Sequence, residues 1–191
     1  MGKVSILVIS IFVVSLSLRL ALCIINRQAN DDHMDVISRI VDKHEIPNKD
    51  DCWECFQPKF FYLMHAGIIR VLHIENKASR IVSVQLVNFI FSFILLFFLW
   101  KFIERQHFSS SVKLSCFALV ALNPCLAGIN VQATNDTLVI VAGVLTIYFA
   151  ELYFTEKKIR DGLLMILFTI LASLVKGSGI VFMIALVIVF L

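Results

Sequence analysis

Three aspartates and a histidine lie close together in the segment NDDHMD, directly after a long apolar run. A carboxylate such as that of Asp31 or Asp32 accepts a proton from a hydroxyl group when it is held within hydrogen-bond reach. Successive residues of a helix point in different directions, so we expect only one of the two to be a catalytic base. The simpler interpretation is that these acids cap and solvate the start of a helix, with Asp35 one turn further on.

The segment CWEC holds two cysteines that fit three kinds of site. Cys52 and Cys55 are compatible with a structural disulfide, a redox-active pair or half of a zinc site. Zinc normally needs a second pair of ligands, and His33 and His44 do not stand at a recognised spacing. A local disulfide is the expected state in an oxidising compartment. We predict this disulfide and no metal site, while redox exchange stays open.

Two cations and a polar pair interrupt the apolar stretches. Lys176 lies in VKGSGI between two short apolar segments, an arrangement that often marks a binding site in membrane proteins. The charge of Lys176 or Arg19 suits a lipid phosphate, whereas snorkelling to the membrane surface is the simpler interpretation. Asn135 and Asp136 either begin a capped helix or form a polar wall that faces an external site.

The elements that would position these residues are apolar helices. Hydrophobic residues make up 59% of the chain, mean hydropathy is +0.89, and soluble domains are about half apolar. The composition therefore predicts an all-α integral membrane protein, and a net charge of +3 gives no reason to expect nucleic acid. About six segments are expected to be transmembrane helices: 4–25, 81–103, 112–131, 138–154, 163–175 and 177–191. The last two are short, because a span takes about 20 residues.

Residues 27–80 form a long polar loop between the first two spans. Apolar residues from Met34 to Val41 recur at helical spacing, which predicts an amphipathic helix. A second apolar segment, 60–72, is too short to span and is expected to lie along the membrane interface. This first external loop is therefore predicted to be helical.

The orientation follows from the distribution of Lys and Arg in the short loops. The loops at 101–113 and 157–160 are basic, whereas the loop at 130–136 carries no Lys or Arg. The positive-inside rule then places the N-terminus in the cytoplasm and residues 27–80 outside. The chain ends in apolar residues, so we expect residues 1–191 to be one transmembrane module from a truncated or longer protein.

Four segments, taken in order, resemble the GT-C glycosyltransferases that use polyprenyl-phosphate sugars. The similarity is to the branch of protein O-mannosyltransferases and aminoarabinose transferases, and it covers essentially the whole chain. The segments are NDDHMD, CWECFQPKFFYLM, ALNP with TNDTL, and LVKGSGI. The second is similar to a Q-P-P-L-Y-Y element, and the fourth to an L-x-K-x-x-G element. Lys59 stands where many members have a second proline, so the turn there is expected to differ.

The resemblance implies a membrane enzyme that transfers a sugar, with inversion, from a polyprenyl phosphate to an external hydroxyl. The acceptor would be a protein, a lipid or a glycan, and no cofactor is implied. Asp31 or Asp32 would be the base, with Asp32 preferred because Asp31 is the more natural helix cap. Arg19 and Lys176 would stabilise the leaving phosphate. Further polar residues would shape the substrate pocket: His33, Gln57, Tyr62, Asn135 and Asp136.

Two other functions stay open at this point. A quinone-coupled thiol oxidoreductase would use Cys52 and Cys55, but it gives no reason for NDDHMD or for FQPKFFY. A non-catalytic, truncated membrane subunit would explain the apolar end of the chain. For all three functions the expected location is a multi-pass position in the plasma membrane of a prokaryote or the endoplasmic reticulum of a eukaryote.

Overall fold

The regular elements of this protein are helices throughout the residues that its computed structural model describes, 3–29 and 31–190. Three helices are long and apolar enough to cross a membrane: α1 (Lys3–Ile25), α4 (Lys77–Arg105) and α7 (Asp136–Glu156). The shorter elements are α2 (His33–Lys43), the 3-10 turn η1 (Trp53–Phe56), α3 (Phe60–Val71), α5 (Ser110–Ala121), α6 (Pro124–Ile129), α8 (Ile159–Val175), the 3-10 turn η2 (Gly177–Gly179) and α9 (Ile180–Phe190).

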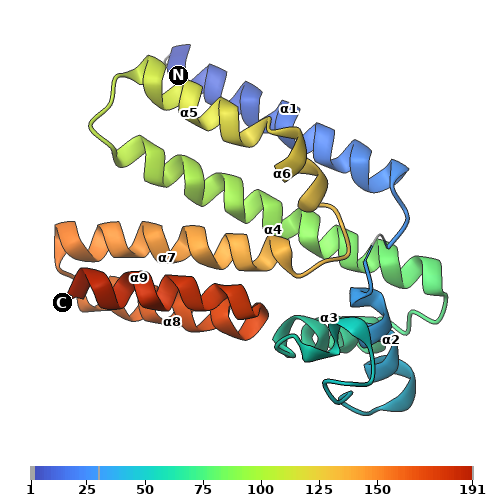
Figure 1. The fold of residues 1–191 in the computed structure, drawn as a ribbon. Helices are drawn as coiled ribbons and strands as arrows, with labels where there is room; N and C mark the ends of the chain where they lie inside the picture. Colours follow the sequence, from blue (N-terminus) through green and yellow to red (C-terminus); the bar gives the residue numbers. More distant parts are fainter. Residues whose placement is uncertain (1–2, 30, 191) are drawn as a thin grey trace.

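The long helices lie side by side, with α4 in the middle of the bundle (Figure 1). One side of α4 contacts α1 and α5, and the other contacts α7, which packs along α8. Many apolar side chains of α1 and α9 point outward and are exposed, as expected of helices that lipid surrounds. This arrangement confirms the prediction of an all-α, GT-C-like membrane protein.

The expected third span, 112–131, is not continuous, which corrects its predicted boundaries. Helix α5 ends at Ala121, and α6 begins at Pro124. Pro124 has no N–H and occupies the first turn of α6, where none is needed, while the side chain of Asn123 accepts a hydrogen bond from the Leu126 N–H at 3.0 Å. The apolar run therefore forms two short helices instead of one span.

The loop between α1 and α4 packs as a small helical unit at one end of the bundle (Figure 1). The apolar face of α2, which includes Met34, Ile37 and Ile40, is buried against Phe61 and Ile69 of α3. The same hydrophobic core extends to residues of α4, α7 and α8. This continuous core holds the start of α2 against the ends of the long helices, where the candidate site lies.

Candidate functional site

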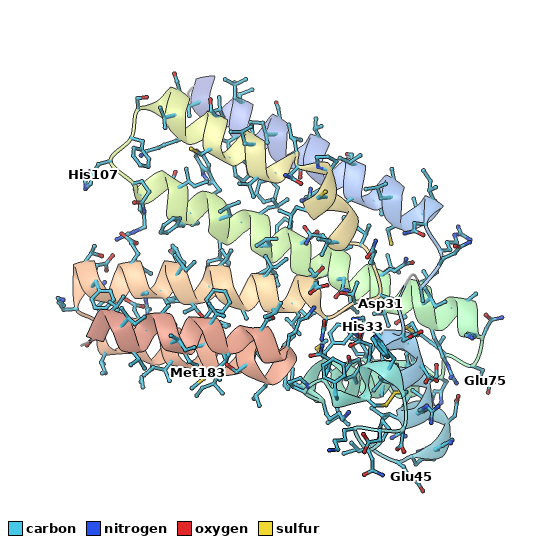
Figure 2. The ribbon with its side chains drawn as sticks, in the orientation of Figure 1. Asp31, His33, Glu45, Glu75, His107 and Met183 are labelled. Atoms are coloured by element: carbon cyan, nitrogen blue, oxygen red, sulfur yellow. A yellow bond between two sulfur atoms is a disulfide. The ribbon has the colours of Figure 1, made fainter. Side chains whose placement is uncertain are left out.

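The imidazole of His33, the first residue of α2, lies where three segments meet (Figure 2). Its Nδ1 is 2.8 Å from the hydroxyl oxygen of Tyr62 on α3 and 3.9 Å from Oε2 of Glu54 in η1. Its Nε2 is 3.4 Å from Oδ2 of Asp31. His33 and Tyr62 are both fully buried, so this polar cluster is built into the fold and is not a surface feature.

The electrostatic environment keeps both aromatic groups neutral at pH 7. Burial lowers the pKa of His33, and the carboxylates of Asp31 and Glu54 oppose that shift. Burial also raises the pKa of Tyr62, and the charges of Glu54, Asp31 and Asp136 raise it further. Because a neutral imidazole and a neutral phenol can form one hydrogen bond with each other, the close contact between them is favourable.

A second polar pair comes from α7 and from the end of α8. Lys176, directly after α8, forms an ion pair with Oδ1 of Asp136 at the start of α7. The other oxygen of Asp136 accepts a hydrogen bond from the Thr134 hydroxyl at 3.0 Å. Asn135 Nδ2 donates to the carbonyl oxygen of Val175 at 3.2 Å, which fixes the end of α8. Asp136 and Lys176 both contribute to the electrostatics of His33, so this pair lies near the His33 cluster.

Asp31 and Asp32 occupy different positions at the start of α2. Asp32 is the N-cap residue, but its side chain makes no capping hydrogen bond. Asp31 instead accepts a hydrogen bond from the Asp32 N–H at 2.9 Å through Oδ1, and its Oδ2 faces His33. The expectation that Asp31 is the helix cap is therefore wrong, because Asp32 stands at that position.

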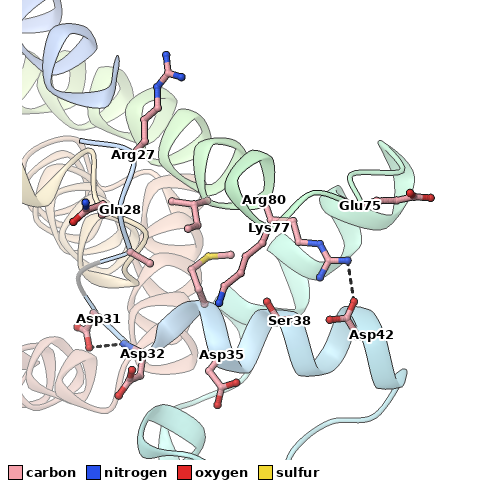
Figure 3. A pocket seen from close by; sticks show the side chains of 13 residues that line it. Arg27, Gln28, Asp31, Asp32, Asp35, Ser38, Asp42, Glu75, Lys77 and Arg80 are labelled. Carbon is pink, nitrogen blue, oxygen red and sulfur yellow. Dashed lines mark hydrogen bonds and ion pairs between the residues drawn. The ribbon is translucent and has the colours of Figure 1, made fainter. Parts of the chain in front are cut away.

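A cavity of about 800 Å³ opens beside these two aspartates. Figure 3 shows Asp31, Asp32 and Asp35 along the start of α2, with Lys77 and Arg80 reaching toward α2 from the start of α4. The cavity is thus lined by charges of both signs, which suits a polar ligand more than an apolar one.

Arg19 lies apart from this cluster, on α1. Its fully buried guanidinium donates to Asn130 Oδ1 at 3.1 Å and to the Ala121 carbonyl oxygen at 2.8 Å. It also contacts Ser15 one turn earlier on α1. These contacts hold α1 to the break between α5 and α6, because Ala121 ends one helix and Asn130 follows the other.

Glu54 is the site residue that sequence reasoning missed. The structure joins Cys52 and Cys55 in a disulfide that encloses Trp53 and Glu54 in η1. This short covalent loop directs the Glu54 carboxylate inward, where only 8% of the residue is exposed. Its only signal in the sequence was its place between the two cysteines. Gln57, by contrast, is half-buried, and its backbone N–H donates a hydrogen bond to the backbone carbonyl oxygen of Glu54 at 3.2 Å.

A family model described as "Dolichyl-phosphate-mannose-protein mannosyltransferase" matches residues 60–191. The matched part runs from α3 to the end of the chain and includes Tyr62, Asn135, Asp136 and Lys176. The acidic motif and the CWEC turn precede it. The corresponding comparisons with curated proteins and with solved structures give no match.

Proposed function

Since the chain belongs to the dolichyl-phosphate-mannose-protein mannosyltransferase family, we propose that it moves a sugar from a polyprenyl-phosphate donor to an external hydroxyl group. Family membership makes the protein a multi-pass membrane glycosyltransferase of GT-C type. One observation carries the finer proposal: the Asp136–Lys176 pair lies close enough to His33 of the acidic motif for both of its charges to act on the imidazole.

Lys176 is the proposed contact for the donor phosphate. A polyprenyl tail stays in the bilayer, so the phosphate and the sugar of the donor must lie near the membrane surface. The side chain of Lys176 is 25% exposed, just after the short helix α8. Asn135 and Asp136 hold it in place, and a fixed cation stabilises the negative charge that develops on a leaving phosphate.

Asp32 is the proposed general base. Inversion requires the acceptor hydroxyl to attack the anomeric carbon from the side opposite the phosphate and to lose its proton. The Asp32 carboxylate is exposed, lines the 800 Å³ cavity and makes no capping hydrogen bond, so its oxygens are open to an acceptor. Both oxygens of Asp31 already face other groups, which makes Asp31 the second candidate.

The remaining predicted pocket residues receive narrower roles. Neutral His33 and Tyr62 are proposed to form the polar wall behind the acidic motif. Gln57, half-buried just before α3, is proposed to contact the sugar. Arg19 is proposed to act indirectly, by fixing α1 against α5 and α6, because its Nε and Nη1 are used in those contacts.

The proposed orientation places residues 27–80 and the site outside the membrane and the N-terminus in the cytoplasm. Figure 1 supports it, because the N-terminus and the turns after α4 and α7 lie at one end of the bundle, with α2 and α3 at the other. The first of these ends carries the basic residues Lys101, Arg105, Lys157 and Lys158.

The proposal is tested with the full-length protein in proteoliposomes that contain a polyprenyl-phosphate mannose and a hydroxyl acceptor. Asp32→Asn should lower turnover about 100- to 10,000-fold, because positioned proton transfer contributes on that scale. Asp35→Asn is the matched control, since Asp35 lines the same cavity but is paired with Arg39 at 3.0 Å. Near-normal turnover in both Asp31→Asn and Asp32→Asn would refute the proposal that either aspartate is the general base.

A further inference from the structure

We propose that Asp31, His33 and Glu54 bind a divalent transition-metal ion such as Zn²⁺ or Mn²⁺. Each residue offers one ligand atom, and these atoms all lie within 4.8 Å of one another. Two ligands at about 2.0–2.2 Å from one tetrahedral zinc ion lie roughly 3.3–3.6 Å apart. Small side-chain rotations therefore bring the three atoms onto one ion. The proposal goes beyond sugar transfer and does not rest on it.

The Glu54 carboxylate gives the second, independent observation. The residue is 8% exposed, and its Oε2 has no hydrogen-bond partner among the described residues. This oxygen faces the His33 ring, 3.9 Å from Nδ1. A buried carboxylate without a partner is costly, whereas a buried carboxylate that coordinates a metal is compensated. Glu54 therefore brings a buried carboxylate, with one oxygen unpaired, within 4.8 Å of the ligand atoms of Asp31 and His33.

The local charge balance favours a cation as well. Asp31 and Glu54 bring two carboxylates to one imidazole, and that imidazole is 2% exposed. Lys176, whose charge also acts on His33, is already paired with Asp136. The ligand set of one imidazole and two carboxylates matches transition metals better than Ca²⁺ or Mg²⁺, which take oxygen ligands.

The scaffold around the three residues resembles the support that metal ligands require. The Tyr62 hydroxyl contacts Nδ1 of His33 and fixes the orientation of the ring. The Cys52–Cys55 disulfide fixes the turn that carries Glu54, and the Asp32 N–H holds the Asp31 carboxylate. A bound ion would join the segment before α2 to η1 and so order the acidic motif beside the cavity.

The test uses the purified full-length protein in detergent, without donor or acceptor. Metal content is measured by elemental analysis after purification, and the protein is then stripped and titrated with Zn²⁺, Mn²⁺, Ca²⁺ and Mg²⁺ while its Tm is followed. We expect about one transition-metal ion per chain and a rise in Tm on titration. No bound ion and no Tm shift, or a response to Ca²⁺ and Mg²⁺ alone, would overturn the proposal.

Variants separate binding from folding and from turnover. Glu54→Gln keeps the shape of the side chain and should weaken binding at least about 10-fold, whereas Glu45→Gln, at an exposed position of the same loop, should bind as the parent does. His33→Gln provides a second ligand change should the first variant fold poorly. Asp32→Asn should still bind the ion, even where it lowers turnover. Unchanged binding in Glu54→Gln and His33→Gln would disprove this ligand set.

Discussion

His65 is a buried histidine on α3 whose two ring nitrogens have no hydrogen-bond partner among the described residues. Burial lowers its pKa to about 3, against roughly 6.5 in an unfolded chain. The unfolded state therefore binds the proton more readily than the folded state does. The contribution of neutral His65 to the unfolding free energy is fully present above about pH 6.5. It is lost as the pH falls from 6.5 toward 3, by about 1.4 kcal/mol per pH unit.

Replacement of His65 by leucine should remove this pH dependence. Between pH 7.5 and pH 5.0 the parent protein should lose about 2 kcal/mol more unfolding free energy than His65→Leu does. Thermal unfolding in detergent, followed by tryptophan fluorescence at both pH values, measures the difference. His107→Gln, at an exposed position, should behave as the parent does. The same loss in parent and His65→Leu would mean that His65 is solvated in the folded protein.

Lys176 makes a charge-specific prediction for the transfer step. Lys176→Met keeps the length of the apolar stem but removes the cation, and should reduce kcat/KM about 100- to 1,000-fold if Lys176 meets the leaving phosphate. Lys176→Arg should retain more activity than Lys176→Met, because it keeps the charge. The exposed Lys158, at the other end of α8, supplies the control Lys158→Met. Equal activity in Lys176→Met and the parent would exclude the phosphate contact.

At the scale of elements, the packing of α7 against α9 depends on Gly143. A methyl group at Gly143 would stand 2.2 Å from Cζ of Phe182, so the Phe182 ring or one of the two helices must shift. Gly143→Ala should lower the unfolding free energy by about 1–3 kcal/mol, and Phe182→Leu in the same chain should restore part of that loss. Thermal unfolding of the single and double variants measures the coupling; simple additivity of the two changes would contradict the contact.

Gly179 and Gly67 are two further positions at which the cost of a glycine-to-alanine change can be compared with that at Gly143. At Gly179 the added methyl group would meet the backbone oxygen of Ala172 at 2.1 Å, which no second side-chain change can relieve. Gly179→Ala should therefore cost more than Gly143→Ala. At Gly67 nothing lies within 4 Å, so Gly67→Ala in α3 should be tolerated.

The helices were largely predictable, because apolar runs and amphipathic spacing are local properties of a sequence. Pro124 signalled the break at Asn123–Pro124. The apolar residues on both sides outweighed that signal in the prediction of one continuous span. The partners of Arg19 and the inward position of Glu54 were not predictable. They depend on contacts with Asn130 and Ala121 far along the chain, and on a turn whose direction the disulfide sets.

At the scale of the whole molecule, the proposed orientation predicts which surfaces face the outside. In a background without the free cysteines, a single cysteine at the exposed Asp50 should react with a membrane-impermeant maleimide on intact cells. One at the exposed Lys158 should react only after permeabilisation. Asn130 is unsuitable for such labelling because it is fully buried. The reverse pattern would invert the topology and place the acidic motif in the cytoplasm.

The buried guanidinium of Arg19 also sets a problem of timing during synthesis. Its partners at Ala121 and Asn130 are separated from it by 102 and 111 residues. A ribosome that adds about 5–20 residues per second delivers them about 5–20 s after Arg19 has left the exit tunnel. A charge at the centre of a lone helix costs roughly 2.5–3.5 kcal/mol to insert, and Arg19, which lies nearer the Ile25 end of α1, costs up to that amount. We expect the insertion machinery to retain α1 during this interval and to release it once α5 and α6 arrive.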